Sequence, residues 1–191
     1  MKQKKVIVAL SGGVDSSVSA ALLKRDGFDV VGVFMKCWVE GEKCTSTEDE
    51  KMARLAAVKI GIPFYSLDLI KDYRKRVVDY MLKGYEKGIT PNPDVMCNKE
   101  IKFGLFYDKA LAMGADYVAT GHYAQVRNGK ILAGKDSNKD QSYFLSMINA
   151  SVLSKVLFPI GKYTKPQVRT MARKFGLPTA ERPDSQGLCF I

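Results

Sequence analysis

The feature that most constrains this chain is a loop of glycine and serine at residues 11–17, Ser-Gly-Gly-Val-Asp-Ser-Ser. It follows residues 4–10, an apolar run rich in valine and isoleucine that predicts a buried parallel strand. It precedes apolar residues at helical spacing, and Gly27 is placed to end that helix. Glycines let the backbone bring N–H groups to an anion, and a helix N-terminus adds partial positive charge. This junction therefore predicts a phosphate-binding site.

The loop differs from two common phosphate-binding loops. The Walker loop supplies a lysine to the phosphates, whereas the first lysine after this loop is Lys24. The glycine spacing of dinucleotide-binding loops is also missing. Asp15 cannot bind an anion directly, so we expect it to help hold Mg²⁺ or to organise the loop. The alternative is a glycine turn capped by serines with no ligand, which the strand–loop–helix context disfavours.

Strand and helix patterns alternate along most of the chain. This alternation predicts an α/β fold, in which right-handed connections build a parallel sheet with helices on both faces. Ligands of such sheets bind at the carboxyl ends of the strands. We therefore expect the loop at 11–17, Met35, the turn before Cys97 and the pair Gly121-His122 to converge. The further expected strands are residues 30–35, 64–69 and 116–120, and the further helices are residues 46–60, 73–85 and 96–113, with Thr45 and Glu48 as a capping box.

The last third of the chain has a different pattern. Asn128-Gly129 lies at the centre of residues 124–133, which is typical of a β-hairpin. Residues 140–147 and 165–175 predict short amphipathic helices separated by proline-containing loops. The expected organisation is an α/β domain at residues 1–135 and a small helical and loop extension at residues 136–191.

The net charge of the chain is +10, from 30 Lys and Arg against 20 Asp and Glu. A surplus of this size favours a polyanionic partner, because each neutralised phosphate releases condensed counterions. Simple solubility is the alternative explanation. The charge is spread along the chain, so it suggests nucleic acid without locating a contact.

The four cysteines are scattered and form no C-x-x-C pair, and there is a single histidine, His122. A structural zinc site normally needs paired ligands, so metal ligation by these residues is disfavoured. The apolar runs are too short for a signal peptide or a membrane span. We therefore expect a cytoplasmic protein with reduced thiols. The cysteines are Cys37, Cys44, Cys97 and Cys189.

The segment at residues 90–98, Thr-Pro-Asn-Pro-Asp-Val-Met-Cys-Asn, is the second informative signal. Two prolines flank an asparagine, so residues 88–94 predict an ordered loop followed by a helix start. A cysteine near a helix N-terminus has a lowered pKa and a more reactive thiolate, which would suit Cys97 for nucleophilic chemistry. The alternative is a buried core cysteine. Cys189, between Leu188 and Phe190, could equally be a buried strand thiol.

The loop at residues 11–17 resembles the signature of the PP-loop ATP pyrophosphatase superfamily, whose members split ATP between the α- and β-phosphates and transfer AMP to an oxygen. The chain as a whole resembles the tRNA-specific 2-thiouridylases, which thiolate the uridine at the first anticodon position. The second resemblance rests on six segments in order: residues 9–17, 32–38, 92–98, 119–124, 139–145 and 184–191.

The resemblance implies a role for each matching residue. The catalytic residues would be Cys189 as the persulfide carrier, Cys97 as its partner nucleophile and Asp94 as an acid/base group. The ATP-binding residues would be Ala9, Leu10, Ser11, Gly12, Gly13, Val14, Asp15, Ser16, Ser17, Met35 and Gly121. The tRNA-binding residues would be Asn92, Pro93, Asp94, His122, Lys139, Asp140 and Gln141.

The implied reaction adenylates the C2 oxygen of the uridine with ATP and Mg²⁺, and a persulfide then replaces it with sulfur. Its implied partners are tRNA and a sulfur-donor protein, with no membrane. Chains of this family continue into further domains, so we expect this sequence to be a fragment. Two alternatives remain: another PP-loop adenylating ligase or thiolase, and a module that only binds nucleotide or RNA.

Overall fold

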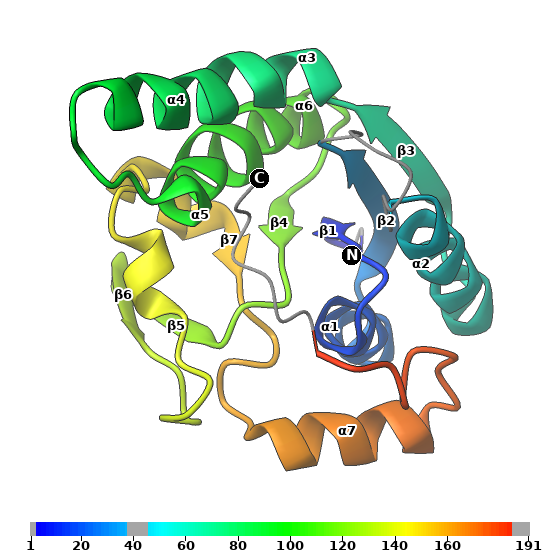
Figure 1. The fold of residues 1–191 in the computed structure, drawn as a ribbon. Coiled ribbons are helices and arrows are strands. Elements are labelled where there is room, and N and C mark those ends of the chain that lie inside the picture. The colour runs from blue at the N-terminus through cyan, green and yellow to red at the C-terminus, as the bar shows by residue number, and fades with distance from the viewer. Residues whose placement is uncertain (1–2, 38–45, 185–191) are drawn as a thin grey trace.

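The computed structural model describes residues 3–37 and 46–184, and its centre is a parallel sheet of five strands (Figure 1). The strand order is β3-β2-β1-β4-β7, so the first strand is central and the chain extends the sheet on both sides of it. This confirms the α/β fold and the four expected strands. The strands are β1 (Lys5–Ala9), β2 (Asp29–Lys36), β3 (Phe64–Asp68), β4 (Tyr117–Ala119) and β7 (Val156–Leu157).

The central strand is buried on both faces, as its unbroken apolar sequence predicts. Alternate side chains enter two separate cores: Ile7 packs with Phe106 of α6, while Val8 packs with Ala20 of α1 and Ala53 of α2. Helices therefore cover both faces. These helices are α1 (Val14–Arg25) and α2 (Ser46–Ile60) on one face and α6 (Phe106–Ala112) on the other.

Two long helices contain π-helical stretches, which change the hydrogen-bond pattern without ending the helix. One is formed by α3 (Ile70–Tyr73), η1 (Arg74–Val78) and α4 (Asp79–Glu86), and the other by α5 (Pro93–Met96), η2 (Cys97–Leu105) and α6. The second helix begins three residues earlier than expected. Pro93 occupies its first turn and the Asn92 Oδ1 accepts a hydrogen bond from the Val95 N–H, so Pro93 and Asp94 are helical rather than part of a loop.

The hairpin is confirmed: β5 (Ala124–Arg127) pairs antiparallel with β6 (Lys130–Ala133). Asn128 and Gly129 both have positive φ, as the tight turn requires. The helix expected at 140–147 is wrong, because only η3 (Ser142–Leu145), a 3₁₀ turn, forms there. The Asp140 carboxylate accepts from the Ser142 N–H and hydroxyl, which favours a tight turn over a helix.

The remaining elements tie the last third of the chain to the sheet. After η4 (Ala150–Lys155), the strand β7 pairs with β4, so the sheet extends past the boundary expected at residue 135. The helix α7 (Lys165–Lys174) then packs against the outer side of α1, where Val168 and Ala172 join Val14 and Val18 in one core (Figure 1). The Thr164 and Gln167 capping box fixes the start of α7.

Candidate active site

The loop at residues 11–17 joins β1 to α1 at the carboxyl edge of the sheet, and its last four residues form the first turn of α1. Its serines stabilise the loop itself: the Ser17 hydroxyl donates to the Gly13 carbonyl at 2.8 Å and Ser16 Oγ accepts from the Ser11 N–H at 3.1 Å. The N–H groups in the first turn of α1 have no acceptors within the helix. Together with the partial positive charge of a 12-residue helix, they are suited to bind phosphate.

Two glycines allow the backbone around the loop to pack closely. Gly12 has φ +81°, and a Cβ there would lie 2.3 Å from the Asp49 carbonyl oxygen in α2. A Cβ at Gly121 would lie 2.6 Å from the Ser16 nitrogen. Gly121 therefore lets the chain after β4 pass directly against the first turn of α1, at the edge where the sequence predicts it.

Asp15 is engaged by two residues from distant parts of the chain. Lys165, at the start of α7, contacts both carboxylate oxygens at 2.8 Å, and the Tyr123 hydroxyl donates to Oδ1 at 2.8 Å. Burial raises the pKa of the Tyr123 hydroxyl and the Asp15 charge raises it further, so this hydroxyl stays protonated and remains a donor. These contacts link Asp15 to Tyr123 and to the start of α7.

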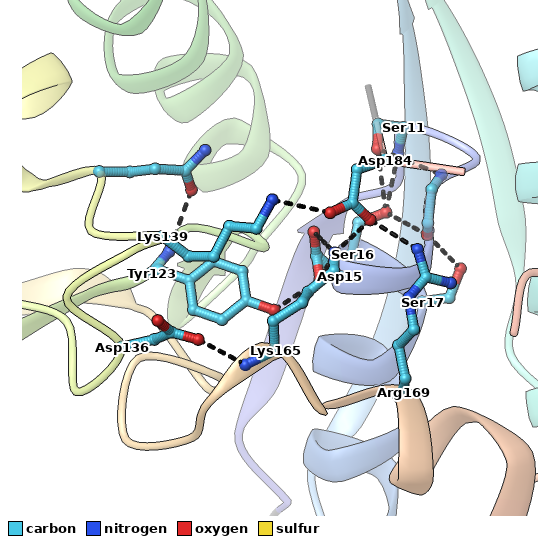
Figure 2. A network of polar contacts seen from close by, with 12 residues as sticks. Ser11, Asp15, Ser16, Ser17, Tyr123, Asp136, Lys139, Lys165, Arg169 and Asp184 are labelled. Atoms are coloured by element: carbon cyan, nitrogen blue, oxygen red, sulfur yellow. Dashed lines mark hydrogen bonds and ion pairs between the residues drawn. The ribbon is translucent and has the colours of Figure 1, made fainter. Parts of the chain in front are cut away.

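Asp184 is the centre of a second set of ion pairs beside the loop (Figure 2). Its carboxylate lies 2.9 Å from Lys165 Nζ, 2.8 Å from Lys139 Nζ and 2.6 Å from an Arg169 nitrogen. Burial would raise the pKa of Asp184, but the lysine hydrogen bonds outweigh it and hold the pKa well below its usual range. Sequence reasoning assigned Lys165, Arg169 and Asp184 no role at this site, because they meet only in the folded chain.

Arg182 links the same segment to the loop from the other side. Its guanidinium donates to the Gly12 carbonyl at 2.9 Å and pairs with Asp49 at 2.8 Å. Residues 177–184 therefore lie against the loop at residues 11–17, held by contacts on both sides. Sequence reasoning missed Arg182 for the same reason as the Asp184 partners.

Cys97 lies at the start of η2, in a different environment from the loop. It is 7% exposed and packs with Met96, Ile101 and Tyr73, while Met35 at the end of β2 packs against the same cluster. Burial raises the pKa of the Cys97 thiol, although Lys102 opposes this. The expected lowered pKa is therefore wrong for this conformation, because Cys97 lies beyond the first turn of its helix and is shielded from water.

The residues around Cys97 form the rest of this region. Asn98 is 2% exposed and its Nδ2 donates to the Asp94 carbonyl at 2.9 Å, but its Oδ1 has no hydrogen-bond partner among the residues that the structure describes. Asp94 is half-buried and Asn92 is exposed. The helix α5 packs against η3, so residues 92–94 and 139–141 lie on neighbouring elements.

His122, one of the expected tRNA contacts, is buried within the fold. Its ring lies between Phe103 and Phe158, and its Nδ1 is 2.7 Å from the Thr120 hydroxyl. Burial, with a contribution from Lys102, places the pKa of His122 well below its ordinary value. The side chain is therefore a neutral core group.

The expected tRNA contacts at residues 139–141 are of two kinds. Lys139 is exposed and pairs with Asp184. Asp140 and Gln141 instead hydrogen-bond within the protein: Asp140 accepts from the Gly134 N–H and Gln141 Oε1 accepts from the Tyr123 N–H. These two side chains hold the hairpin in place.

The site fits a triphosphate better than it fits a protein-bound metal. The loop supplies N–H donors and a close-packed glycine cradle, whereas the described parts of the chain contain no cluster of three His, Cys, Asp or Glu. Both oxygens of Asp15 already contact Lys165, so Asp15 is not available for Mg²⁺ in this arrangement. Thr45, Cys44 and Cys189 lie outside the described residues.

Within the two described ranges, no helix is long and apolar enough to cross a membrane.

Comparison with curated proteins gives relatives that cover nearly all of this chain. The tRNA-specific 2-thiouridylase MnmA of Streptococcus sanguinis is 54% identical over 98% of this chain and 52% of its own length. That of Flavobacterium johnsoniae is also 54% identical, over 98% of this chain and 51% of its own length. The chain thus spans about half the length of the curated relatives it matches.

Solved structures with low sequence identity share the fold. NMN synthetase from Francisella tularensis matches with a TM-score of 0.61 at 17% identity, over 97% of this chain and 68% of that one. A 4-thiouridine synthetase–RNA complex with bound ATP matches with a TM-score of 0.60 at 16% identity, over 94% of this chain and 43% of that one. The family model described as the tRNA methyl transferase HUP domain matches residues 4–191, and the chain belongs to that family.

Proposed function

We propose that this chain is the nucleotide-binding part of a tRNA 2-thiouridylase, which uses ATP to replace the C2 oxygen of the wobble uridine with sulfur. The observation that carries the proposal is the position of two predicted functional groups at the same edge of the sheet. The loop at 11–17 and Cys97 both lie there, in a chain 54% identical to proteins named tRNA-specific 2-thiouridylase.

In the proposed first step, the uridine C2 oxygen attacks the α-phosphorus of ATP. A C2–O–P bond forms, the bond to the β-phosphate breaks, and pyrophosphate leaves. The loop N–H groups and Ser11, Ser16 and Ser17 would hold the phosphates, while Met35 and Gly121 would border the nucleotide. Mg²⁺ bound to the ATP phosphates would supply charge neutralisation and would arrive with the nucleotide.

In the proposed second step, a persulfide on Cys189 attacks C2 through its terminal sulfur. Cys97 then attacks the Cys189 sulfur, so the persulfide S–S bond breaks and its electrons stay on the sulfur attached to C2. AMP leaves with the former C2 oxygen, and a Cys97–Cys189 disulfide remains. The raised pKa of Cys97 means that this thiol must lose its proton before it attacks, and Asp94 is the candidate acceptor.

Recognition of tRNA would use the surface formed by α5 and the loop before η3. Asn92, Pro93 and Asp94 would meet the target base after it leaves its stack, and Lys139 would contact phosphate. The net charge of +10 favours such a polyanionic partner. A cytoplasmic sulfur-donor protein that loads the persulfide completes the proposal.

The proposal is tested by mass analysis of unmodified tRNA after incubation with ATP, Mg²⁺, a persulfide donor and the protein at its full natural length. Replacement of one oxygen by sulfur at a wobble uridine is the expected result. Unchanged tRNA would overturn the proposed function. Pyrophosphate release without sulfur incorporation would favour another adenylating ligase. Absence of both pyrophosphate and thiolated tRNA would favour a module that only binds nucleotide or RNA.

A further inference from the structure

The loop at 11–17 contains no cation, although the reaction proposed for it releases pyrophosphate. The next lysine in the sequence, Lys24, lies in the last turn of α1, at the end of the helix opposite the loop. Backbone N–H groups alone carry only partial charge, and enzymes that transfer or cleave phosphoanhydrides normally add lysine, arginine or metal ions. A source of full positive charge beside this loop is therefore to be found elsewhere in the chain.

The fold brings four cations beside the loop from other elements: Arg182, which contacts the Gly12 carbonyl, and three that share Asp184. Lys165 contacts Asp15, which is 150 positions away in sequence and belongs to the loop itself. Arg169, one turn along α7, lies 2.6 Å from the same Asp184 oxygen that lies 2.9 Å from Lys165. Lys139 contacts the other oxygen of Asp184 at 2.8 Å. The Lys165 side chain is almost fully buried, which is an unfavourable environment for a lysine without an anion.

The geometry points to Lys165 and Arg169 as ligands of the β- and γ-phosphates of ATP, with Lys139 at their open side. Asp184 occupies the phosphate position when no nucleotide is bound. One carboxylate that receives three cations imitates a phosphate group, which also offers several oxygens to lysine and arginine. The same cations then stabilise the charge on the leaving pyrophosphate.

Asp184 is consequently an internal competitor of ATP. The phosphates must displace its carboxylate from Lys165, Arg169 and Lys139, while Lys165 can keep its contact with Asp15. This inference rests on the proposal that the loop binds ATP, and it adds the residues that recognise the part of ATP beyond the α-phosphate.

The test is titration calorimetry of the protein at its full natural length with ATP, AMP and pyrophosphate, without tRNA. Lys165→Met keeps most of the buried stem, and Arg169→Gln keeps a polar group. Each substitution is expected to weaken ATP and pyrophosphate binding about tenfold or more, because a charge-assisted hydrogen bond is lost. AMP, which lacks the β- and γ-phosphates, should bind within about twofold of the unaltered chain.

Matched controls lie on the same segment. Lys162→Met removes an exposed lysine that lies over the Tyr163 ring, and Arg173→Gln removes an exposed arginine paired with Glu181. Both should leave all three affinities unchanged. Unchanged ATP affinity in the Lys165 and Arg169 variants would overturn the inference. So would a loss of the same size for AMP, because it would indicate a structural effect.

Asp184→Asn gives an independent test with the opposite sign, and it keeps all three cations should Lys165→Met fail to fold. Removal of the competing charge is expected to tighten ATP and pyrophosphate binding about three- to tenfold. Unchanged or weaker binding would overturn the inference that Asp184 competes with ATP for these cations. Absence of ATP binding in the unaltered protein would overturn both proposals. If the unaltered protein binds ATP and thiolates tRNA, but the variants bind ATP with unchanged affinity, only the assignment of the phosphate ligands is overturned.

Discussion

Two regions of the carboxyl edge differ sharply in character. The loop region is polar and partly solvated, and its charged groups form a chain of ion pairs from Asp15 through Lys165 to Asp184. The Cys97 region is apolar, and it holds its thiol at 7% exposure in a hydrophobic cluster. In the proposed function, phosphate replaces Asp184 as the partner of the cations in the first region. The second region must open before the Cys97 thiol could take part in the proposed reaction.

This difference suggests an order of events. Arg169 and Asp184 in the loop region are partly exposed, so a polyanion can reach them from solvent, and we infer that ATP binds before tRNA arrives. A buried thiol with a raised pKa is protected from oxidation and from unwanted reaction until substrate binding rearranges its surroundings. We infer that activation of the uridine depends on the loop region alone and that sulfur release depends on the Cys97 region.

The largest expected effect is that of Cys97→Ser, which should affect thiolation but not ATP binding. In the protein at its full natural length, Cys97→Ser should lower the rate of tRNA thiolation at least about a thousandfold. The serine hydroxyl cannot attack the Cys189 sulfur to form the disulfide that releases the thiolated uridine. ATP affinity should remain unchanged. Thiolation is measured by mass analysis of the tRNA, and ATP affinity by calorimetry.

Cys37→Ser is the matched control for that substitution. Cys37 is half-buried at the border of the same cluster but has no role in the proposed reaction, so thiolation should continue. Thiolation at the normal rate in Cys97→Ser would contradict the assignment of Cys97.

The second effect tests whether the loop region is held by close packing. Gly121→Ala would place a Cβ 2.6 Å from the Ser16 nitrogen, so the first turn of α1 must shift. The free energy of unfolding should fall by about 2–4 kcal/mol and ATP binding should weaken. Denaturant unfolding and calorimetry measure the two quantities.

Gly27→Ala is the control for backbone strain without a clash. Gly27 has φ +88°, and a Cβ added there would meet no atom of the described residues within 4 Å, so the cost should be about 1–2 kcal/mol. ATP affinity should not change, because Gly27 lies at the far end of α1. Equal loss of ATP affinity in both variants would contradict the role of Gly121.

The smallest effect concerns His122, the only histidine in the chain. Its folded pKa is lowered, so the unfolded state binds the proton first, and stability falls as pH drops below about 6.5. Between pH 7.5 and 5.5 this amounts to about 1 kcal/mol. His122→Phe should remove that part of the pH dependence in denaturant unfolding curves. An unaltered pH dependence would show that the pKa of His122 is the same in the folded and the unfolded chain, which would contradict its burial as a neutral group.

Short strand patterns that alternate with helical patterns were sufficient to predict the sheet through β4, and Asn128-Gly129 was sufficient to predict the hairpin. β7 was missed because two residues, Val156 and Leu157, form no readable pattern and become a strand only by pairing with β4. The same limit applies to the site. The loop at 11–17 is local in sequence, whereas the burial of Cys97 depends on tertiary packing.

The most direct test of the account is tRNA-dependent exchange between pyrophosphate and ATP, measured with the full natural length protein and with its Cys97→Ser variant. Exchange reports reversible transfer of AMP to tRNA and requires no sulfur. If activation belongs to the loop region alone, both proteins should exchange pyrophosphate at similar rates while only the unaltered protein thiolates tRNA. Absence of tRNA-dependent exchange in both, or its loss in the Cys97→Ser variant, would contradict the account.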